Sequence, residues 1–186
     1  MNPDRPRFRA PAADRPLHVV LVEPEIPPNT GNIARLCAAT GCPLHLCGPL
    51  GFRMDAHAVR RAGLDYWHLV ELHQHRTLAE AEANIVAARP RRAEPPRTFL
   101  FSGHAERSYL DASFRQGDVL VFGRESVGLP EDLLAERSAH TLAIPMLGAV
   151  RSLNLANAVS IGLYEALRQL GLLAAARGTD LPLSAR

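Results

Sequence analysis

A strand-to-helix junction at residues 23–41, EPEIPPNTGNIARLCAATG, holds the first residues whose types and spacing could do chemistry. Its prolines fix backbone angles and lower the entropy of the unfolded loop. Asn29 or Thr30 is expected to cap the helix that follows, and Gly31 would allow another backbone to approach closely. The same residues would also make an ordinary helix start, so this segment alone does not establish a site.

The N–H groups at this helix start are predicted to form an anion-binding site, because the first turn of a helix leaves them without partners. Arg35 would lie about one turn into the helix, on the side of Asn32. The junction therefore predicts a place where a negatively charged group and a guanidinium could meet.

A second polar loop, FGRESVGLP, occupies residues 122–130. Gly123 and Gly128 bracket it, and Pro130 suits the first turn of a helix. Glycines at these positions would let backbone donors and acceptors reach a flat ligand. The spacing is not the GxGxxG fingerprint of dinucleotide-binding proteins, and an ordinary loop remains the alternative.

A third segment, residues 144–165, starts with Ile-Pro-Met, which could form an apolar wall for an aromatic ring. Short polar side chains then crowd a predicted helix start at Ser152, Asn154 and Asn157. Asn154 and Asn157 share one face of that helix, and polar groups on an otherwise apolar helix need partners. These partners could be each other, a ligand or a second copy of the chain.

The elements that must position these segments follow from hydrophobic periodicity. Short apolar runs predict strands at 17–23, 43–48, 67–72, 98–103, 118–123 and 140–145. Helical spacing and stop signals predict helices that end at Gly41 and span 55–63, 76–88 and 154–170. Strands alternating with helices predict an α/β domain with a mostly parallel sheet and helices on both faces. Ligands bind beyond the carboxyl ends of such strands, where all three segments lie.

Length and composition fit one domain. The chain has 186 residues, of which 47% are hydrophobic, and a net charge of +2. We expect a disordered Arg- and Pro-rich arm at 1–16, the domain at 17–171 and a frayed tail at 172–186. Neither a membrane-spanning run nor a secretory signal is evident, so a cytoplasmic protein without membrane contact is expected.

The titratable residues exclude some chemistry. All basic residues are arginine, so no Schiff-base or P-loop lysine exists. Cys37, Cys42 and Cys47 are expected to be small buried thiols, because their spacing does not suit a metal site and their number does not suit a closed disulfide framework. His73 and His75, like His57, are expected at exposed helix or loop positions without a role.

Taken together, the three segments, with RRAGLDYW at 60–67 and RSLNLANAVSIGLYEALRQ at 151–169, resemble the SPOUT superfamily of RNA methyltransferases. Within it, they are similar to small bacterial tRNA 2′-O-methyltransferases that modify the wobble nucleotide, cytidine or uridine 34, of certain leucine tRNAs. The resemblance covers residues 17–171. It implies a C-terminal trefoil knot, a homodimer, S-adenosylmethionine bound in the knot and tRNA as the partner.

The resemblance also implies site residues, and none of them binds a metal. The residues expected to serve catalysis are Arg35, Glu125, Asn29 and Asn154. Those expected to bind the cofactor are Phe101, Gly123, Ile144, Met146, Ser152 and Asn154. Those expected to contact RNA are Arg35, Arg151 and Arg124.

Arg35 is expected to orient the ribose and to stabilise developing oxyanion charge, since a guanidinium with a pKa above about 12 is a poor base. The proton of the hydroxyl would pass to a phosphate, to water or to Glu125. Three alternatives stay open: a 2′-O-methyltransferase for another site in rRNA or tRNA, a non-catalytic tRNA-binding relative, and a nucleotide-binding metabolic enzyme.

Overall fold

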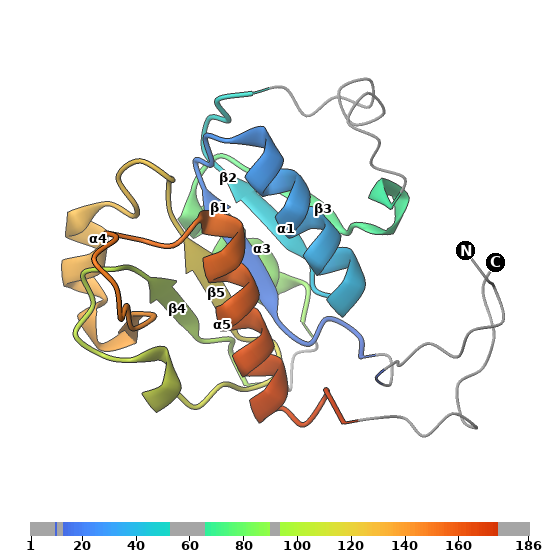
Figure 1. Ribbon diagram of the computed structural model, residues 1–186. Helices are drawn as coiled ribbons and strands as arrows, with labels where there is room; N and C mark the ends of the chain where they lie inside the picture. The colour runs from blue at the N-terminus through green and yellow to red at the C-terminus, as the bar shows by residue number, and fades with distance from the viewer. Residues whose placement is uncertain (1–9, 11–12, 53–65, 90–93, 175–186) are drawn as a thin grey trace, which may run out of the picture.

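The computed structural model describes residue 10 and residues 13–52, 66–89 and 94–174 (Figure 1). The strands within these ranges are β1 His18–Val22, β2 Leu44–Cys47, β3 Leu72–His75, β4 Thr98–Phe101, β5 Val119–Phe122 and β6 Thr141–Leu142. The α-helices are α1 Pro27–Thr40, α3 Leu78–Ala87, α4 Glu131–Glu136 and α5 Leu155–Gln169. The helix predicted at 55–63 and most of the arm and tail lie outside the described residues.

All six strands form one parallel sheet in the order β3-β2-β1-β5-β4-β6. The predicted parallel sheet is therefore confirmed. The chain crosses from β1 to the β2–β3 side, then moves to the β5–β4–β6 side. This order places the carboxyl ends of β1 and β5 next to each other, so the loops that follow these strands are neighbours although they lie about a hundred residues apart.

Helices cover both faces of the sheet, as predicted. In Figure 1, α1 and α5 lie side by side on the near face and α3 lies behind. Val19 and Leu21 belong to the core under α1 and α5, whereas Val20 belongs to the core under α3. Because strand residues alternate between faces, an apolar run such as HVVLV is needed to bury both sides.

Helix α5 packs through the stripe that its sequence predicts: Leu155, Val159, Leu163 and Leu167 are all buried. Gly162 lies on the same side, and a Cβ there would come within 2.9 Å of the Phe101 ring. That ring stacks on Phe122 with centroids 4.6 Å apart. The glycine thus lets α5 approach the aromatic pair where β4 and β5 end.

Two predicted strands need correction. Residues 67–72 were predicted as a strand, but Trp67–Leu69 form a 3-10 turn and the strand begins at Leu72. The polar sequence of this edge strand hides it from an analysis of apolar runs. The strand predicted at 140–145 ends at Leu142, because Ala143 instead exchanges main-chain hydrogen bonds with Arg107 and Tyr109.

The domain boundaries stay predictions, although a few residues of the predicted arm and tail contact the domain. Leu17 is fully buried, and Arg15 of the predicted arm pairs with Glu71. Leu172 and Leu173 of the predicted tail pack against the core. No helix among the described residues is long and apolar enough to cross a bilayer. The trefoil knot also stays a prediction.

The three cysteines are buried and free, as predicted. Burial raises the pKa of the Cys37 and Cys42 thiols, and it raises that of Cys47 to about 12. All three are therefore neutral core residues under physiological conditions. Among the described residues, no cluster of His, Cys, Asp and Glu is arranged to hold a metal ion.

His73 is exposed as predicted, but the predicted helix or loop position was wrong for both His73 and His75, because both lie in strand β3 and His75 is half-buried. His75 Nε2 lies 3.0 Å from His45 Nδ1, and His45 Nε2 lies 3.1 Å from His18 Nδ1. Asn84 Nδ2 lies 3.3 Å from His75 Nδ1 and can only donate to it. With Asn84 as the donor, His75 donates from Nε2 to His45, and His45 donates from Nε2 to His18. Two imidazoles therefore donate in one direction, toward His18.

This histidine chain makes the fold sensitive to acid. Burial lowers the pKa of His18 to about 4 and that of His45 to about 3, from an ordinary value of 6.5. As the pH falls from about 6.5 to 4, the unfolded chain takes up protons that the folded chain excludes. We expect the free energy of unfolding, measured with denaturant, to fall steadily through this window. His45→Gln should flatten the dependence, whereas His104→Gln in an exposed loop should not; equal slopes in all three proteins would contradict this account.

Candidate active site

The start of helix α1 differs from the prediction. The helix begins at Pro27 after Ile26, and no side chain caps it. Pro27 and Pro28 carry no N–H, and the N–H groups of Glu25 and Ile26 already donate to the carboxylate of Glu125, at 2.8 and 3.2 Å. The main-chain donors at this helix start therefore bind an anion from the chain itself, the Glu125 carboxylate, and are not open to a ligand as predicted.

Asn29 does not cap the helix either; its side chain joins three segments. Its Nδ2 donates to Glu125 at 3.0 Å, and its Oδ1 accepts from Asn154 Nδ2 at 2.9 Å. Asn154 Oδ1 in turn accepts from the N–H of Ala156 at 2.9 Å and so caps α5. Asn29 is only 6% exposed, so both ends of its amide need these partners.

A second carboxylate makes the reciprocal contact. Glu25 accepts from the N–H of Ser126 at 3.0 Å and from its hydroxyl at 2.9 Å. Thus the loop after β1 donates to Glu125, and the loop after β5 donates to Glu25. We call Glu25, Asn29, Glu125, Ser126 and Asn154 the loop clasp.

The clasp is reinforced at Glu23, which forms an ion pair with Arg124. Glu23 has a φ of 50°, a left-handed conformation that costs about 1–2 kcal/mol for a residue with a side chain. Its N–H donates to Cys47 at 2.8 Å, so the strained residue is held from both sides. Strain of this kind gathers at functional sites. Sequence reasoning missed Glu23, Glu25 and Ser126; the acidic character of the first loop was the only signal.

The clasp determines which groups could take a proton. The two oxygens of Glu125 together accept three hydrogen bonds, each worth about 1.5–3 kcal/mol for a charged acceptor. Asn29 and Asn154 do not titrate. The geometry therefore favours Glu125 as a structural acceptor over the alternative role of proton acceptor.

The glycines of the second loop are needed for the backbone conformation of the loop. Arg124 and Gly128 exchange two main-chain hydrogen bonds across a tight turn, in which Gly128 has a φ of 76°. A Cβ on Gly123 would collide with the backbone of Gly128 and Leu129. Only glycine fits at position 123, whether or not a ligand is bound.

The residues predicted to bind a cofactor lie at the carboxyl ends of β4, β5 and β6. The Phe101 side chain is core, stacked on Phe122, so only its main chain is presented to this edge. Ile144 and Met146 are half-buried, and Ser152 is exposed. No main-chain hydrogen bond of residues 144–152 occurs within the described part of the chain.

Arg35 is not part of the clasp. It lies six residues after Asn29 and so points about 120° away around the helix. Its guanidinium stacks over the ring of Tyr66, 4.7 Å from the centroid. Arg151 is exposed on the 144–152 side, and Arg124 is held by Glu23. The structure thus joins Asn29, Glu125 and Asn154 but leaves the three arginines in different surroundings.

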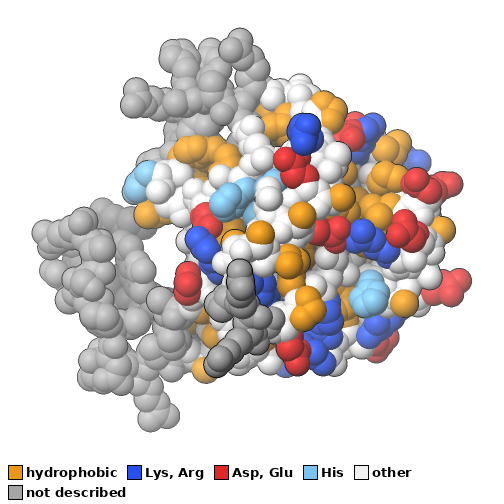
Figure 2. All heavy atoms as spheres, turned by 180° about the vertical axis from the view of Figure 1, so that it is seen from behind, with side chains coloured by type: hydrophobic (Ala, Val, Ile, Leu, Met, Phe, Trp, Pro, Cys, Tyr) orange, Lys and Arg blue, Asp and Glu red, His pale blue; other side chains and the backbone are white. Residues whose placement is uncertain are grey.

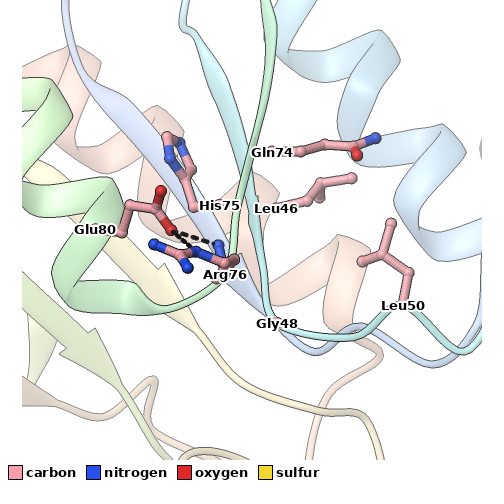
Figure 3. A pocket seen from close by; sticks show the side chains of 7 residues that line it. All are labelled: Leu46, Gly48, Leu50, Gln74, His75, Arg76 and Glu80. Carbon is pink, nitrogen blue, oxygen red and sulfur yellow. Dashed lines mark hydrogen bonds and ion pairs between the residues drawn. The ribbon is translucent and has the colours of Figure 1, made fainter.

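A pocket of about 360 Å³ opens elsewhere, at the carboxyl ends of β2 and β3 (Figure 3). Leu46 and Leu50 form its apolar side, while Arg76 and Glu80 form an ion pair with each other at its polar side. It lies on the β2–β3 side of β1, opposite to β5, β4 and β6. No motif in the sequence predicts a ligand at this pocket, and Arg76 is already paired with Glu80.

On the opposite face of the molecule, the described residues carry basic and acidic side chains together. Figure 2 shows basic and acidic side chains interspersed over the side that faces away from α1 and α5. Arg97 pairs with Asp118, Arg137 with Glu82 and Arg76 with Glu80.

The chain is similar in sequence and in overall structure to known RNA methyltransferases. The chain is 48% identical over 153 residues to the tRNA (cytidine(34)-2'-O)-methyltransferase of Acidovorax sp. strain JS42, covering 82% of this chain and 91% of the relative. It resembles a solved structure described as structural insights into the 2-OH methylation of C/U34 on tRNA, with a TM-score of 0.72, 53% identity, and coverage of 83% and 96%.

A third similarity is to the SpoU methyltransferase AviRb of Streptomyces viridochromogenes, solved in complex with AdoMet, with a TM-score of 0.68 and 30% identity over 87% of this chain and 60% of AviRb. The SpoU rRNA Methylase family matches residues 16–164, which is most of the chain and includes every member of the loop clasp. The protein belongs to the SpoU methylase family.

Proposed function

We propose that this protein transfers a methyl group from S-adenosylmethionine to the ribose 2′-hydroxyl of the wobble nucleotide, cytidine or uridine 34, of tRNA. The observation that carries the proposal is the similarity, over 82% of this chain and 91% of the relative, to a protein named for this reaction. Such an enzyme would act in the cytoplasm, where tRNA is modified.

The residues at the carboxyl ends of β4 to β6 fit the cofactor. Ile144 and Met146 offer half-buried apolar surface for an adenine ring, and the polar main-chain groups of residues 144–152 are available to a ligand. A Cβ on Gly148 would meet no atom within 4 Å, so there is room beside this segment. S-adenosylmethionine, when bound, supplies an electrophilic methyl group on its sulfonium.

The chain's own residues would contribute position and charge. The loop clasp holds the 123–128 loop and the start of α5 in fixed register with α1. Arg35 would orient the ribose or an adjacent phosphate and stabilise the developing oxyanion. Correct alignment of the two reacting groups accounts for several kcal/mol of a barrier of this kind. The hydroxyl proton would pass to water or phosphate, because Glu125 already accepts three hydrogen bonds that hold the loops together.

We further propose a homodimer. Arg35 points away from the loop clasp of its own chain, so a second copy would be needed to bring a guanidinium to the cofactor. The outer face of α5 supports this, because Ile161 and Tyr164 are 36% and 46% exposed there. Exposed apolar side chains on adjacent turns are typical of a helix that packs against a partner.

A second candidate function is 2′-O-methylation of a nucleotide in rRNA, which the description of the family favours. A third, a non-catalytic RNA-binding role, is less well supported. It would not require the strained Glu23 and the clasp that fixes both loops.

Methyl transfer tests the proposed function. Purified protein with S-adenosylmethionine and total tRNA from a strain lacking it should yield 2′-O-methylcytidine or 2′-O-methyluridine at position 34 by nucleoside mapping. Arg35→Ala should lower kcat by about 100-fold or more, because a transition-state donor is lost. Methylation only of rRNA or of another tRNA position would favour the second candidate. Cofactor binding in calorimetry without any transfer would favour the third.

Sedimentation tests the dimer. The wild-type protein should have twice the 20.3 kDa mass of one chain. Ile161→Glu should give monomers without activity, whereas Val86→Glu, at an exposed apolar position on α3, should stay dimeric. Mixing the inactive Arg35→Ala and Asn154→Ala variants should restore part of the activity if the two residues serve one site from different copies. A monomeric wild-type protein with full activity would contradict the proposal.

A further inference from the structure

A second cavity, of about 310 Å³, lies where the loops after β1 and β5 part. These two strands are neighbours in the sheet, but the chain leaves them toward opposite faces: α1 covers one face, and α4 packs against the core on the face of α3 (Figure 1). Ligands of open α/β sheets bind at such a point, because the diverging loops leave a crevice beyond the carboxyl ends of the two strands. We call this crevice the β1–β5 cavity.

The β1–β5 cavity combines apolar surface with a few charged groups. The apolar side chains that line it are those of Val22, Val127, Leu129 and Pro130. The charged side chains that line it are those of Glu23, Arg124 and Glu131, of which Glu23 and Arg124 form an ion pair. Gly128 also lines the cavity, and a Cβ there would meet no atom within 4 Å, so the space beside this turn is open.

Val127 presents apolar surface to this cavity. It is 71% exposed, and it follows three polar residues at 124–126. The preceding residue, Ser126, is held by Glu25 through its N–H and its hydroxyl, so the main chain that carries Val127 is fixed. Single exposed apolar residues are common on protein surfaces, but this one borders a cavity that offers further apolar surface. A ligand that covered Val127 would therefore gain from removing it from water.

A nucleobase matches this lining better than a phosphate does. The faces of a base are apolar and could lie between Val127 and Leu129, while the polar edge of the base would meet the charged groups. The exposed carboxylate of Glu131 can accept a hydrogen bond from an exocyclic amino group. A phosphate would instead face two carboxylates and only one guanidinium, which is already paired.

The place of the cavity along the sheet edge suits a neighbour of the methylated nucleotide. Strand β4 is adjacent to β5, and β6 is the next strand beyond it. Neighbouring strands lie about 4.8 Å apart, so the ends of β4 and β6 lie about 5–10 Å from that of β5. Stacked nucleotides rise about 3.4 Å each, so a strand of RNA can span this distance within a few nucleotides.

We propose that the β1–β5 cavity holds the base of a nucleotide adjacent to nucleotide 34, while the ribose of nucleotide 34 lies at the carboxyl ends of β4 to β6. This inference rests on the proposed function and deepens it by naming a second contact with the substrate. Val127 would contact the RNA and would not contact the cofactor.

Binding of fluorescent tRNA assembled from synthetic halves tests the proposal without turnover. Val127→Ser removes apolar surface and adds no charge, so it should raise the Kd for tRNA about fivefold. An abasic nucleotide at position 33 or 35, whichever base occupies the cavity, should raise the Kd of the wild-type protein similarly. It should have little further effect in Val127→Ser, because both changes remove the same contact. Additive effects at both positions, or an unchanged Kd for Val127→Ser, would overturn the inference.

Val86→Ser is the matched control, because Val86 is 51% exposed on α3 and is not among the residues that line the cavity. It should bind tRNA as tightly as the wild-type protein does. Val127→Ser should also sediment like the wild-type protein. A lower mass for Val127→Ser would show that Val127 contacts a second copy of the chain, and the inference would fail.

Glu131→Ala tests which edge of the base is bound. At the position coupled to Val127, the wild-type protein should bind tRNA with cytosine or adenine about tenfold more tightly than tRNA with uracil, because only the first two carry an amino group for the carboxylate. Glu131→Ala should lose this preference. An equal preference in both proteins would contradict the contact with Glu131.

Methyl transfer separates this inference from the proposed function. Val127→Ser should raise KM for tRNA and leave KM for S-adenosylmethionine unchanged. Methylation at position 34 without coupling between Val127 and either abasic position would overturn this inference alone. Coupled binding without any methyl transfer would overturn the proposed function alone.

Discussion

The carboxylate of Glu125, held by three donors from the loop after β1, is the interaction on which the rest of the site depends. The parallel sheet makes it possible, because β1 and β5 are adjacent and their loops leave the same edge. Without this carboxylate, two main-chain N–H groups and one side-chain amide would lose their partner. With it, the start of α1 is tied to a loop about a hundred residues further along the chain.

The residues that hold the loops together differ from the residue proposed to act on the substrate. Asn29 is hydrogen-bonded to both Glu125 and Asn154, so the position of α1 also fixes the start of α5. The glycine turn at 123–128 closes on itself and supports Ser126 where Glu25 can reach it. The side chains of this network are hydrogen-bonded to one another or to the main chain, which suits a structural support. Arg35, the group suited to meet a charged substrate, lies outside this network and stacks on the ring of Tyr66.

The sequence predicted those strands and helices that short-range patterns of apolar residues determine. Strands such as 17–23 and 118–123 are short apolar runs buried on both faces, and α5 shows its buried stripe directly in its leucine spacing. The prediction failed where the role of a side chain depends on a partner far away in the sequence. Asn29 was predicted as a candidate cap of its own helix, because its actual acceptor, Glu125, lies 96 positions away in the sequence. Strand β3 was missed because its sequence is polar and the partner of His75, His45, lies on another strand. Tyr66 was not singled out because nothing local indicates that its ring meets Arg35.

The central claim is that Glu125 supports the site and does not accept the proton. The most direct measurement is kcat as a function of pH for wild type and Glu125→Gln, with thermal unfolding of both. A supporting role predicts the same shape of the pH profile, a fall in kcat of less than about tenfold and a loss of about 1.5–3 kcal/mol in stability, since one hydrogen bond to a charged acceptor is lost. A fall of about 10²–10⁴-fold, with the acidic limb of the profile abolished and stability unchanged, would identify Glu125 as the general base and contradict the account.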